Sequence, residues 1–190
     1  MQRFVKLLGI GPATHILDVG GTSFDWALLP FKTNVTILNA EIDGRLGALR
    51  WIIGDARRLP FAEKSFDVVY SNSTIEHLYS EDNQRLAAAE IARVGKAYFV
   101  QTPNRWFPIE PHYLTPFVHY LPKKWQRRLL RNFTLWGILS RPSQQTCDTD
   151  VDEIRLLTTS DMRGLFPDAT IYSERFLGLT KSIIAVKSAP

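Results

Sequence analysis

Polar and acidic side chains follow four short apolar runs in the first half of the chain. The runs lead into Asp18-Val19-Gly20-Gly21, Asn39-Ala40-Glu41, Gly54-Asp55-Ala56 and Ser71-Asn72-Ser73. Asn39 or Glu41 can accept hydrogen bonds from ribose hydroxyls, and Asp55 can accept one from an exocyclic amine. The glycine pair lets the backbone approach a ligand closely. Together these residue types predict a site that binds an adenosine.

Two of the four histidines are placed to act on a proton near this site. His77 follows the fourth run closely, and His112 lies in a later segment rich in proline and aromatic residues. An imidazole has an ordinary pKa of about 6.5, which suits removal of a proton from a hydroxyl, an acidic carbon or an ammonium. We expect His77 and His112 to be the candidate catalytic bases, with helix capping or packing as the alternative. No cysteine and histidine cluster has zinc-site spacing, so no metal is expected.

The elements that must position these side chains are short apolar runs that alternate with turn and helix patterns, which is typical of a parallel sheet with crossover connections. We expect strands over 15–19, 35–38, 51–53, 66–70, 97–100, 170–174 and 182–186, with a further extended stretch over 154–157. Ser80 is expected to cap a helix that ends near Gly95, and shorter helices are expected near 1–10 and 160–166. Parallel strands end at one edge of a sheet, so the predicted site lies at that edge.

Residues from about 103 to 152 are expected to be an insertion within a single domain that spans 1–190. No acidic residue lies between Glu110 and Asp148, whereas the same stretch holds Lys123, Lys124, Arg127, Arg128, Arg131 and Arg141. Their three- and four-residue spacing predicts a helix with a cationic stripe, interleaved with aromatic residues. We expect the insertion to form a lid or an acceptor site. The stripe would contact an anionic membrane surface, a phosphate- or carboxylate-bearing acceptor or, less expected, RNA.

The composition is that of an ordinary globular protein, with 190 residues, 45% hydrophobic and 22% charged residues and a net charge of +4. The longest apolar runs are far shorter than the roughly 18 residues of a membrane-spanning helix. A single cysteine cannot form an internal disulfide. We therefore expect a cytoplasmic location, peripheral at a membrane if the basic helix binds lipid.

The chain resembles the class I S-adenosylmethionine-dependent methyltransferases, and within them the type 11 group. The resemblance is densest in Gly54-Asp55-Ala56, Leu59-Pro60-Phe61, Ser65-Phe66-Asp67-Val68-Val69-Tyr70-Ser71-Asn72 and Ile75-Glu76-His77-Leu78. It implies an α/β, Rossmann-like fold with a mostly parallel seven-stranded sheet and an antiparallel terminal strand. It also implies S-adenosylmethionine as the cofactor.

The resemblance assigns roles to the polar residues at the strand ends. Asp18, Gly20 and Gly21 would form the loop beneath the methionine part of the cofactor, Asn39 or Glu41 would hold the ribose, Asp55 with the Ala56 backbone would face the adenine amine, and Asn72 and Ser73 would line the methyl end. Two positions depart from the family pattern. Glycine is usual where Thr22 and Phe24 stand, and an acidic residue is usual where Asn39 stands.

These features favour methyl transfer to an O, N or C nucleophile of a small or lipid-linked molecule. Because the loop has fewer glycines than the family pattern, a non-catalytic cofactor-binding protein of the same fold is one alternative. An RNA methyltransferase that docks through the basic helix at 123–131 is another. Enzymes of this fold that methylate nucleobase amines usually carry a Pro-Pro-aromatic run after the fourth strand. The corresponding residues here are Asn72-Ser73-Thr74-Ile75, so methylation of nucleobase amines is disfavoured.

Overall fold

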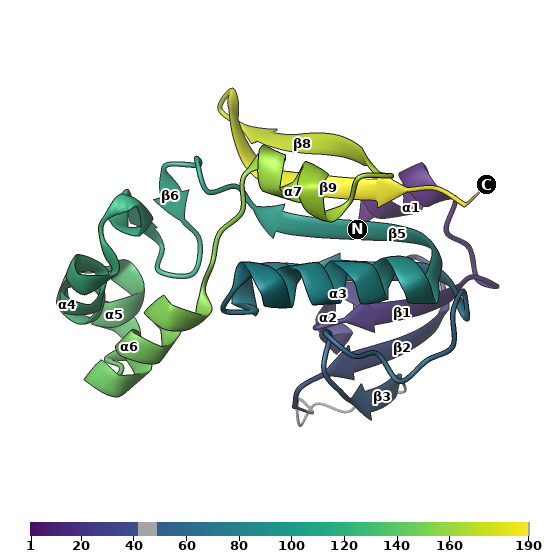
Figure 1. The fold of residues 1–190 in the computed structure, drawn as a ribbon, viewed down its shortest axis with the longest axis horizontal. Helices are drawn as coiled ribbons and strands as arrows, with labels where there is room; N and C mark the ends of the chain where they lie inside the picture. Colours follow the sequence, from purple (N-terminus) through teal and green to yellow (C-terminus); the bar gives the residue numbers. More distant parts are fainter. Residues whose placement is uncertain (42–48, 190) are drawn as a thin grey trace.

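A seven-stranded sheet forms the centre of the computed structural model, which describes residues 1–41 and 49–189. Its strand order is β3-β2-β1-β4-β5-β9-β8 (Figure 1). The strands are β1 (His15–Val19), β2 (Asn34–Asn39), β3 (Arg50–Ile53), β4 (Phe66–Asn72), β5 (Gly95–Pro103), β8 (Thr170–Phe176) and β9 (Leu179–Lys187). The pairs from β3 to β5 are parallel, and β9 runs antiparallel to both of its neighbours. The predicted mostly parallel sheet with an antiparallel last strand is confirmed.

Apolar side chains cover both faces of the sheet because successive residues of a strand point to opposite sides. In β1, Ile16 and Leu17 are both fully buried, yet Ile16 joins the cluster under α1 (Gln2–Leu8) and α2 (Ser23–Ala27). Leu17 joins the cluster under α3 (Glu81–Val94) and α7 (Thr159–Leu165). This two-sided burial explains why the strands read as continuous apolar runs.

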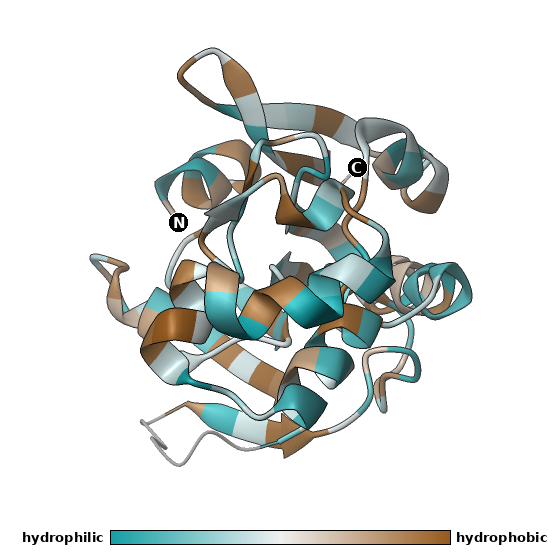
Figure 2. Cartoon of the chain, turned by 90° about the vertical axis from the view of Figure 1, so that its left-hand side faces the viewer, coloured by the Kyte–Doolittle hydropathy of each residue, from teal (hydrophilic) through white to brown (hydrophobic). Residues whose placement is uncertain are grey.

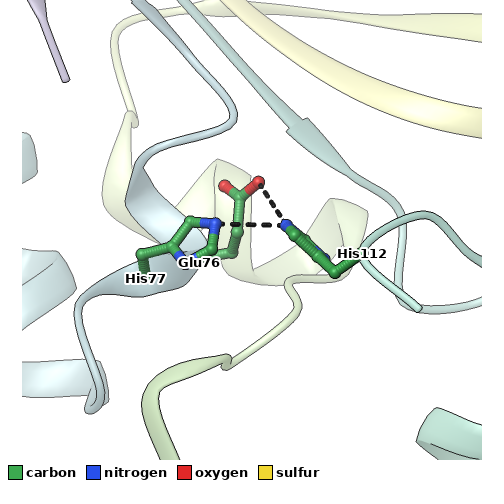
Figure 3. Close-up of side chains that lie close together, drawn as sticks. All are labelled: Glu76, His77 and His112. Carbon is green, nitrogen blue, oxygen red and sulfur yellow. Dashed lines mark hydrogen bonds and ion pairs between the residues drawn. The ribbon is translucent and has the colours of Figure 1, made fainter. Parts of the chain in front are cut away.

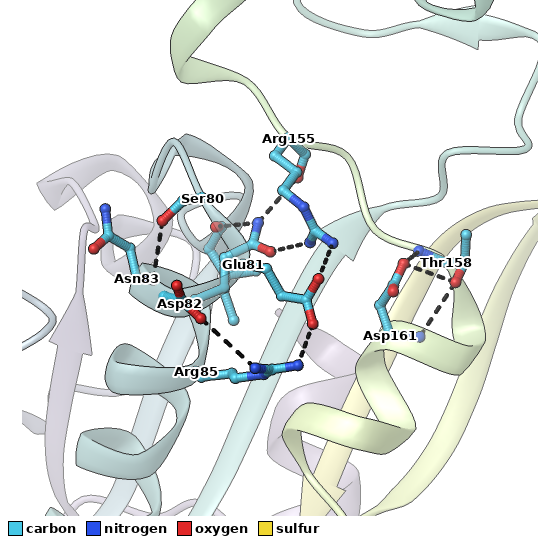
Figure 4. A network of polar contacts seen from close by, with 10 residues as sticks. Ser80, Glu81, Asp82, Asn83, Arg85, Arg155, Thr158 and Asp161 are labelled. Carbon is cyan, nitrogen blue, oxygen red and sulfur yellow. Dashed lines mark hydrogen bonds and ion pairs between the residues drawn. The ribbon is translucent and has the colours of Figure 1, made fainter.

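The helix α3 begins and ends where the sequence predicts. The side chain of Ser80 accepts a hydrogen bond from the backbone N–H of Asn83 at 3.2 Å, and Gly95 follows the last helical residue. Glu81 and Asp82 occupy the first turn, where a negative charge favours the helix dipole (Figure 4). The capped helix fixes the position of the short η1 turn (Ile75–His77), which precedes it in the chain.

The segment between β5 and α7 folds beyond the end of the sheet at which β5 finishes (Figure 1). It contains the hairpin of β6 (Ile109–Glu110) and β7 (Thr115–Pro116), the η2 turn (Val118–Tyr120), α4 (Lys123–Phe133), α5 (Leu135–Ser140) and α6 (Gln144–Glu153). Its buried side chains, which include Tyr113, Leu130 and Cys147, form a small core apart from the two cores that flank the sheet. We call residues 104–156 the insertion.

The chain that returns from α6 is not the extended strand that was predicted over 154–157. Only Leu157 forms an isolated bridge there, with Asn104. Arg155 instead donates to the side chains of Gln84 and, at 3.1 Å, Glu81 on α3 (Figure 4). Its backbone N–H donates to the carbonyl of Glu76 at 2.8 Å. These contacts attach the insertion to η1 and α3, which leaves no backbone ladder for a strand.

Candidate active site

The carboxyl ends of β1, β2, β3 and β4 open into a cleft of about 1000 Å³. Many of the predicted site residues line it, namely Gly20, Asn39, Glu41, Asp55, Ala56, Ser73 and His77. Tyr79 and, from α6, Glu153 also line it. Within the described ranges, the lining does not include Asp18, Gly21, Asn72 or His112.

Gly20 is required by the close approach of two loops at the floor of this cleft. Its φ is +78°, and a Cβ built there would lie 2.2 Å from Cγ2 of Thr74. The hydroxyl of Thr74 donates to the carbonyl of Val19 at 3.1 Å, which locks the loop after β4 against the loop after β1. Only glycine fits between them, so the first glycine of the predicted pair shapes the cleft directly.

Asp18 and Gly21 lie behind the cleft. Asp18 shares the face of β1 with Ile16, so its carboxyl points into the layer below the loop and accepts a hydrogen bond from Nε1 of Trp26 at 2.7 Å. A Cβ on Gly21 would lie 1.7 Å from Oδ2 of Asp18, which shows how tightly the loop lies on this carboxyl. Burial raises the pKa of Asp18 to about 8. Asp18 therefore supports the loop from beneath, while its predicted place under the methionine part of the cofactor stays a prediction.

Asn39 joins the first and second strand ends. Its Nδ2 donates to the carbonyl of Gly21 at 3.2 Å, and its Oδ1 accepts from the backbone N–H of Ala40 at 2.8 Å. Glu41 is exposed at the rim of the cleft. The amide thus sets the spacing of the loops, and the two residues together place oxygen acceptors along one wall.

Asp55 faces an arginine that the sequence reasoning missed. Nε of Arg57 donates to both carboxylate oxygens at 2.9 Å, and Nη2 lies 2.6 Å from Oδ2. The hydrogen bonds from Arg57 hold the pKa of Asp55 below its ordinary value. The backbone N–H of Arg57 also donates to Oδ1 at 2.8 Å, so each oxygen already accepts two hydrogen bonds from Arg57. An amine in the cleft would therefore take the place of one of the hydrogen bonds from the Arg57 side chain. The two-residue spacing of Asp55 and Arg57 was the feature of the sequence that could have indicated this ion pair.

The predicted histidines come into direct contact, although 35 positions separate them. Nε2 of His77 lies 3.1 Å from Nε2 of His112, and the rings meet edge to face (Figure 3). Each Nδ1 has a carboxylate partner, which is Glu153 at 3.0 Å for His77 and Glu110 at 2.6 Å for His112. These four side chains come from η1, the β6–β7 hairpin and the end of α6, and they meet at the rim of the cleft.

Glu76 lies beneath the histidine pair and is fully buried. Its Oε2 accepts from the hydroxyl of Thr102 at 2.9 Å, whereas its Oε1 has no hydrogen-bond partner among the described residues and lies 3.9 Å from Nε2 of His112. Burial raises the pKa of Glu76. Burial also opposes the charged form of His112, but Glu110 and Glu76 leave its pKa above the ordinary value. Sequence reasoning singled out none of the three glutamates, although Glu76 and Glu110 lie beside the predicted histidines in the chain.

Comparison with known proteins supports the predicted family. A family model described as a methyltransferase domain matches residues 17–98, which run from β1 to β5 and include most of the cleft. The predicted resemblance to the S-adenosylmethionine-dependent methyltransferases of class I, type 11, is thereby confirmed.

Solved methyltransferases share the fold. A structure from Methanosarcina mazei, described as an S-adenosylmethionine-dependent methyltransferase, is 16% identical with a TM-score of 0.54 and covers 95% of each chain. A Thermotoga maritima structure, described as an S-adenosylmethionine-dependent methyltransferase and possible histamine N-methyltransferase, is 15% identical with a TM-score of 0.58 and covers 97% of this chain and 86% of its own. At such identities the likeness concerns the fold alone.

Curated relatives match over a shorter stretch. An uncharacterized protein of Mycobacterium tuberculosis is 31% identical over 102 residues, which cover 47% of this chain and 36% of the relative. This chain therefore matches only about a third of that relative's length.

The residues of the cleft fit S-adenosylmethionine, the cofactor of this family. Gly20 lets the loop after β1 lie against Thr74 at the edge of the cleft, and Asn39, Glu41 and Asp55 supply acceptors for hydroxyl and amine groups. Oδ1 of Asn72 is buried with no hydrogen-bond partner in the described parts of the chain, at the strand end where the resemblance expects the methyl end of the cofactor. The acceptor set matches the hydroxyl and amine groups of a nucleoside.

Proposed function

We propose that the protein transfers the methyl group of S-adenosylmethionine to an O, N or C nucleophile of a small or lipid-linked acceptor. One observation supports this most strongly. A single cleft collects the oxygen acceptors of Asn39, Glu41 and Asp55, the tight loop at Gly20, and the histidine pair at its rim. Alignment of two reactants in such a cleft can supply roughly 7 to 11 kcal/mol of a reaction barrier.

When bound, the cofactor supplies an activated methyl group on a positively charged sulfur. The chain's own residues do the rest. Asn39 and Glu41 hold the ribose, Asp55 accepts from the adenine amine, and the loop at Ser73 borders the methyl end. The protein must then hold the acceptor in line and receive its proton, because a neutral hydroxyl loses a proton as the new bond to carbon forms and an ammonium must lose one before it can attack. At the rim, the pair formed by His77 and His112 can accept that proton.

A second pocket of about 430 Å³ lies inside the insertion and supports a place for the acceptor. Tyr113 and Tyr120 line it together with the cations of Arg105, Lys123 and Arg155. Glu110 also lines this pocket and contacts His112, while His77 lines the cleft, so the histidine pair lies between the two spaces. Aromatic walls suit an acceptor that has an apolar body. Arg105, for which the described residues provide no ion pair, suits an anionic group on that acceptor.

Exposed apolar side chains beside cations favour a lipid-linked acceptor. The helices α4 and α5 expose the side chains of Trp125, Phe133, Leu135, Ile138 and Leu139. Figure 2, viewed from the side of the insertion, shows hydrophobic and hydrophilic residues mixed on these helices. None of the helices within 1–41 and 49–189 has both the length and the apolar character to cross a bilayer. The surface therefore supports contact with a membrane from one side.

The cationic stripe is narrower than the sequence indicates. Lys123 and Arg127 form ion pairs with Asp152 on α6, and Arg127 also lies 3.9 Å from Asp148. The remaining cations of α4 are Lys124, Arg128 and Arg131, for which the described residues provide no ion pair. Three cations beside apolar side chains fit an anionic lipid surface better than a nucleic acid groove, so the RNA alternative takes second place.

The direct test is transfer of radiolabelled methyl from S-adenosylmethionine to fractions of an extract of the host cells. We expect label in the lipid or small-molecule fraction. Label in RNA would support the RNA alternative. Tight cofactor binding by calorimetry without label in any fraction would support the non-catalytic alternative. The variant Asp55→Ala should lose label incorporation, whereas Asp67→Ala, at the opposite end of β4, should retain it.

A further inference from the structure

Three side chains at the rim of the cleft present ligand atoms of the kind that hold a transition metal. The carboxylate of Glu76 and the imidazoles of His77 and His112 each offer one such atom, and these atoms all lie within 4.8 Å of one another (Figure 3). We propose that Glu76, His77 and His112 form a binding site for a divalent cation of the zinc type. No metal was expected from the sequence, because the two histidines meet only when the insertion folds back.

The hydrogen bonds at Nδ1 leave no proton on either Nε2 of the two neutral histidines, so the two Nε2 atoms cannot hydrogen-bond to each other. A carboxylate only accepts hydrogen bonds, so the Nδ1 of His77 must carry the proton that faces Glu153, and the Nδ1 of His112 the one that faces Glu110. In the neutral rings this places two lone pairs 3.1 Å apart. A cation between them would satisfy both. Metal-binding histidines have this pattern, with a carboxylate on the nitrogen that does not bind the metal.

Glu76 supplies the negative charge that such a cation needs. Its side chain is fully buried, and Oε1 has no hydrogen-bond partner among the described residues while Thr102 holds Oε2. An unpaired buried carboxylate oxygen is costly, and a bound cation removes that cost. The third ligand is thus in place and already oriented toward His112, whose Nε2 lies 3.9 Å away.

The distances and ligand types select the class of metal. Bonds of 2.0 to 2.1 Å from zinc to nitrogen would give an angle of about 100° for two nitrogens 3.1 Å apart. Oε1 of Glu76 lies 3.9 Å from Nε2 of His112 and must move closer for one ion to contact all three ligands. Two imidazoles and one carboxylate suit Zn²⁺, Co²⁺ or a similar ion, whereas Ca²⁺ and Mg²⁺ prefer oxygen ligands. Three protein ligands leave a fourth position open, as in catalytic zinc sites.

The open position has a place in the reaction if the proposed function holds. His77 borders the cofactor cleft and Glu110, the partner of His112, borders the insertion pocket. An acceptor oxygen or nitrogen bound at the cation would lose its proton more easily, because the cation stabilises the deprotonated form. With the cation bound, both Nε2 atoms are ligands, so the histidines themselves would not take up the proton. The proton would leave to solvent, and the electron pair that it leaves behind would form the bond to the methyl carbon as the bond from that carbon to the cofactor sulfur breaks.

Metal binding can be measured without cofactor or acceptor. The chain is freed of metal with a chelator and titrated with Zn²⁺ by calorimetry, and with Co²⁺ by its visible absorption. We expect one ion per chain. Glu76→Gln, which keeps the size of the side chain, and His112→Asn should each weaken binding at least about 100-fold. Glu110→Gln and Glu153→Gln, which act through the histidines, should weaken it about 10- to 100-fold.

The variant His15→Gln serves as the matched control, because His15 lies in β1 away from this cluster and should leave metal affinity unchanged. Circular dichroism checks that each variant is folded. A wild-type chain that binds Zn²⁺ and Co²⁺ no better than Glu76→Gln would overturn the proposal and leave a proton shared by the two histidines as the explanation of their contact. Cofactor binding is measured separately in the presence of chelator, so failure of the metal site and failure of the proposed function give different results.

Discussion

At the scale of single residues, Asp18 couples the stability of the fold to pH. Burial raises its pKa from 3.8 to about 8, so the folded chain holds this proton more tightly than the unfolded chain. The free energy of unfolding must then fall as pH rises between those values, by at most about 1.4 kcal/mol per pH unit. We predict that Asp18→Asn gains stability relative to the wild type between about pH 5 and pH 8, as measured by urea unfolding. Asp67→Asn, whose carboxylate pairs with Lys96, should show the wild-type slope. Equal slopes in the wild type and Asp18→Asn would contradict this account.

The chain offers a matched pair of glycines with which to test the floor of the cleft. Gly20 and Gly178 both have positive φ, at +78° and +82°, but a Cβ at Gly178 would meet nothing within 4 Å. We predict that Gly178→Ala costs about 1 to 2 kcal/mol of stability from backbone strain alone. Gly20→Ala adds a clash with Thr74 and should cost more, and it alone should weaken cofactor binding. Thermal unfolding and calorimetry measure the two effects, and similar losses in both variants would mean that the loops can move apart.

Asp55 is the residue whose predicted contact with the cofactor is most easily isolated. Its carboxylate is fixed by Arg57 and points along the cleft wall, so removal leaves an adenine amine without an acceptor. We predict that Asp55→Ala weakens S-adenosylmethionine binding by about 1 to 3 kcal/mol, or about 5- to 150-fold. Calorimetry measures the affinity, with Asp67→Ala as the control at the end of β4 that lies away from the cleft. Unchanged affinity would place the adenine elsewhere.

At the scale of elements, α4 carries two sets of cations. One set forms ion pairs within the fold, and the other faces outward. Lys124, Arg128 and Arg131 are the outward set, and Arg128 lies over the ring of Trp125 at 5.8 Å. We predict that replacing all three by glutamine weakens binding to vesicles of anionic lipid about 100-fold, at about 1 kcal/mol per cation. The double variant Lys123→Gln and Arg127→Gln should change it less than about threefold. Sedimentation with the vesicles at low and high salt provides the measurement, and equal effects of the two variants would refute the division.

The elements also show which parts of the molecule the sequence could predict. The strands were predictable because burial on both faces makes each of them a continuous apolar run, and the strand ends of a parallel sheet share one edge. The cleft residues after β1, β2 and β3 follow from that rule. The stretch at 154–157 did not form a strand because Arg155 binds α3, a contact that no local pattern reveals. The histidine pair depends on the path of the whole insertion, so its residues could be chosen from the sequence but their contact could not.

At the scale of the whole molecule, a bound cation would connect the sheet to the insertion. Glu76 and His77 belong to the turn beside the sheet, whereas His112 belongs to the insertion, whose core encloses the chain's only cysteine, Cys147. Burial raises the pKa of this thiol and shields it, so it reacts with a thiol reagent only when the insertion core opens. The rate of that reaction therefore reports how firmly the insertion is held.

Metal binding should slow the modification of Cys147. A ligand that binds only the closed form stabilises it by about 2.7 kcal/mol at a concentration 100 times its dissociation constant, which corresponds to an opening about 100 times rarer. We predict that Zn²⁺ at such a concentration slows the reaction of the wild type with a disulfide reagent by up to that factor. The same ion should have no effect on Glu76→Gln, whose reaction without metal should match the wild type within a few-fold. Equal slowing in both proteins would mean that the ion acts at the thiol itself, and no slowing in either would mean that the insertion opens without breaking the contact between His77 and His112.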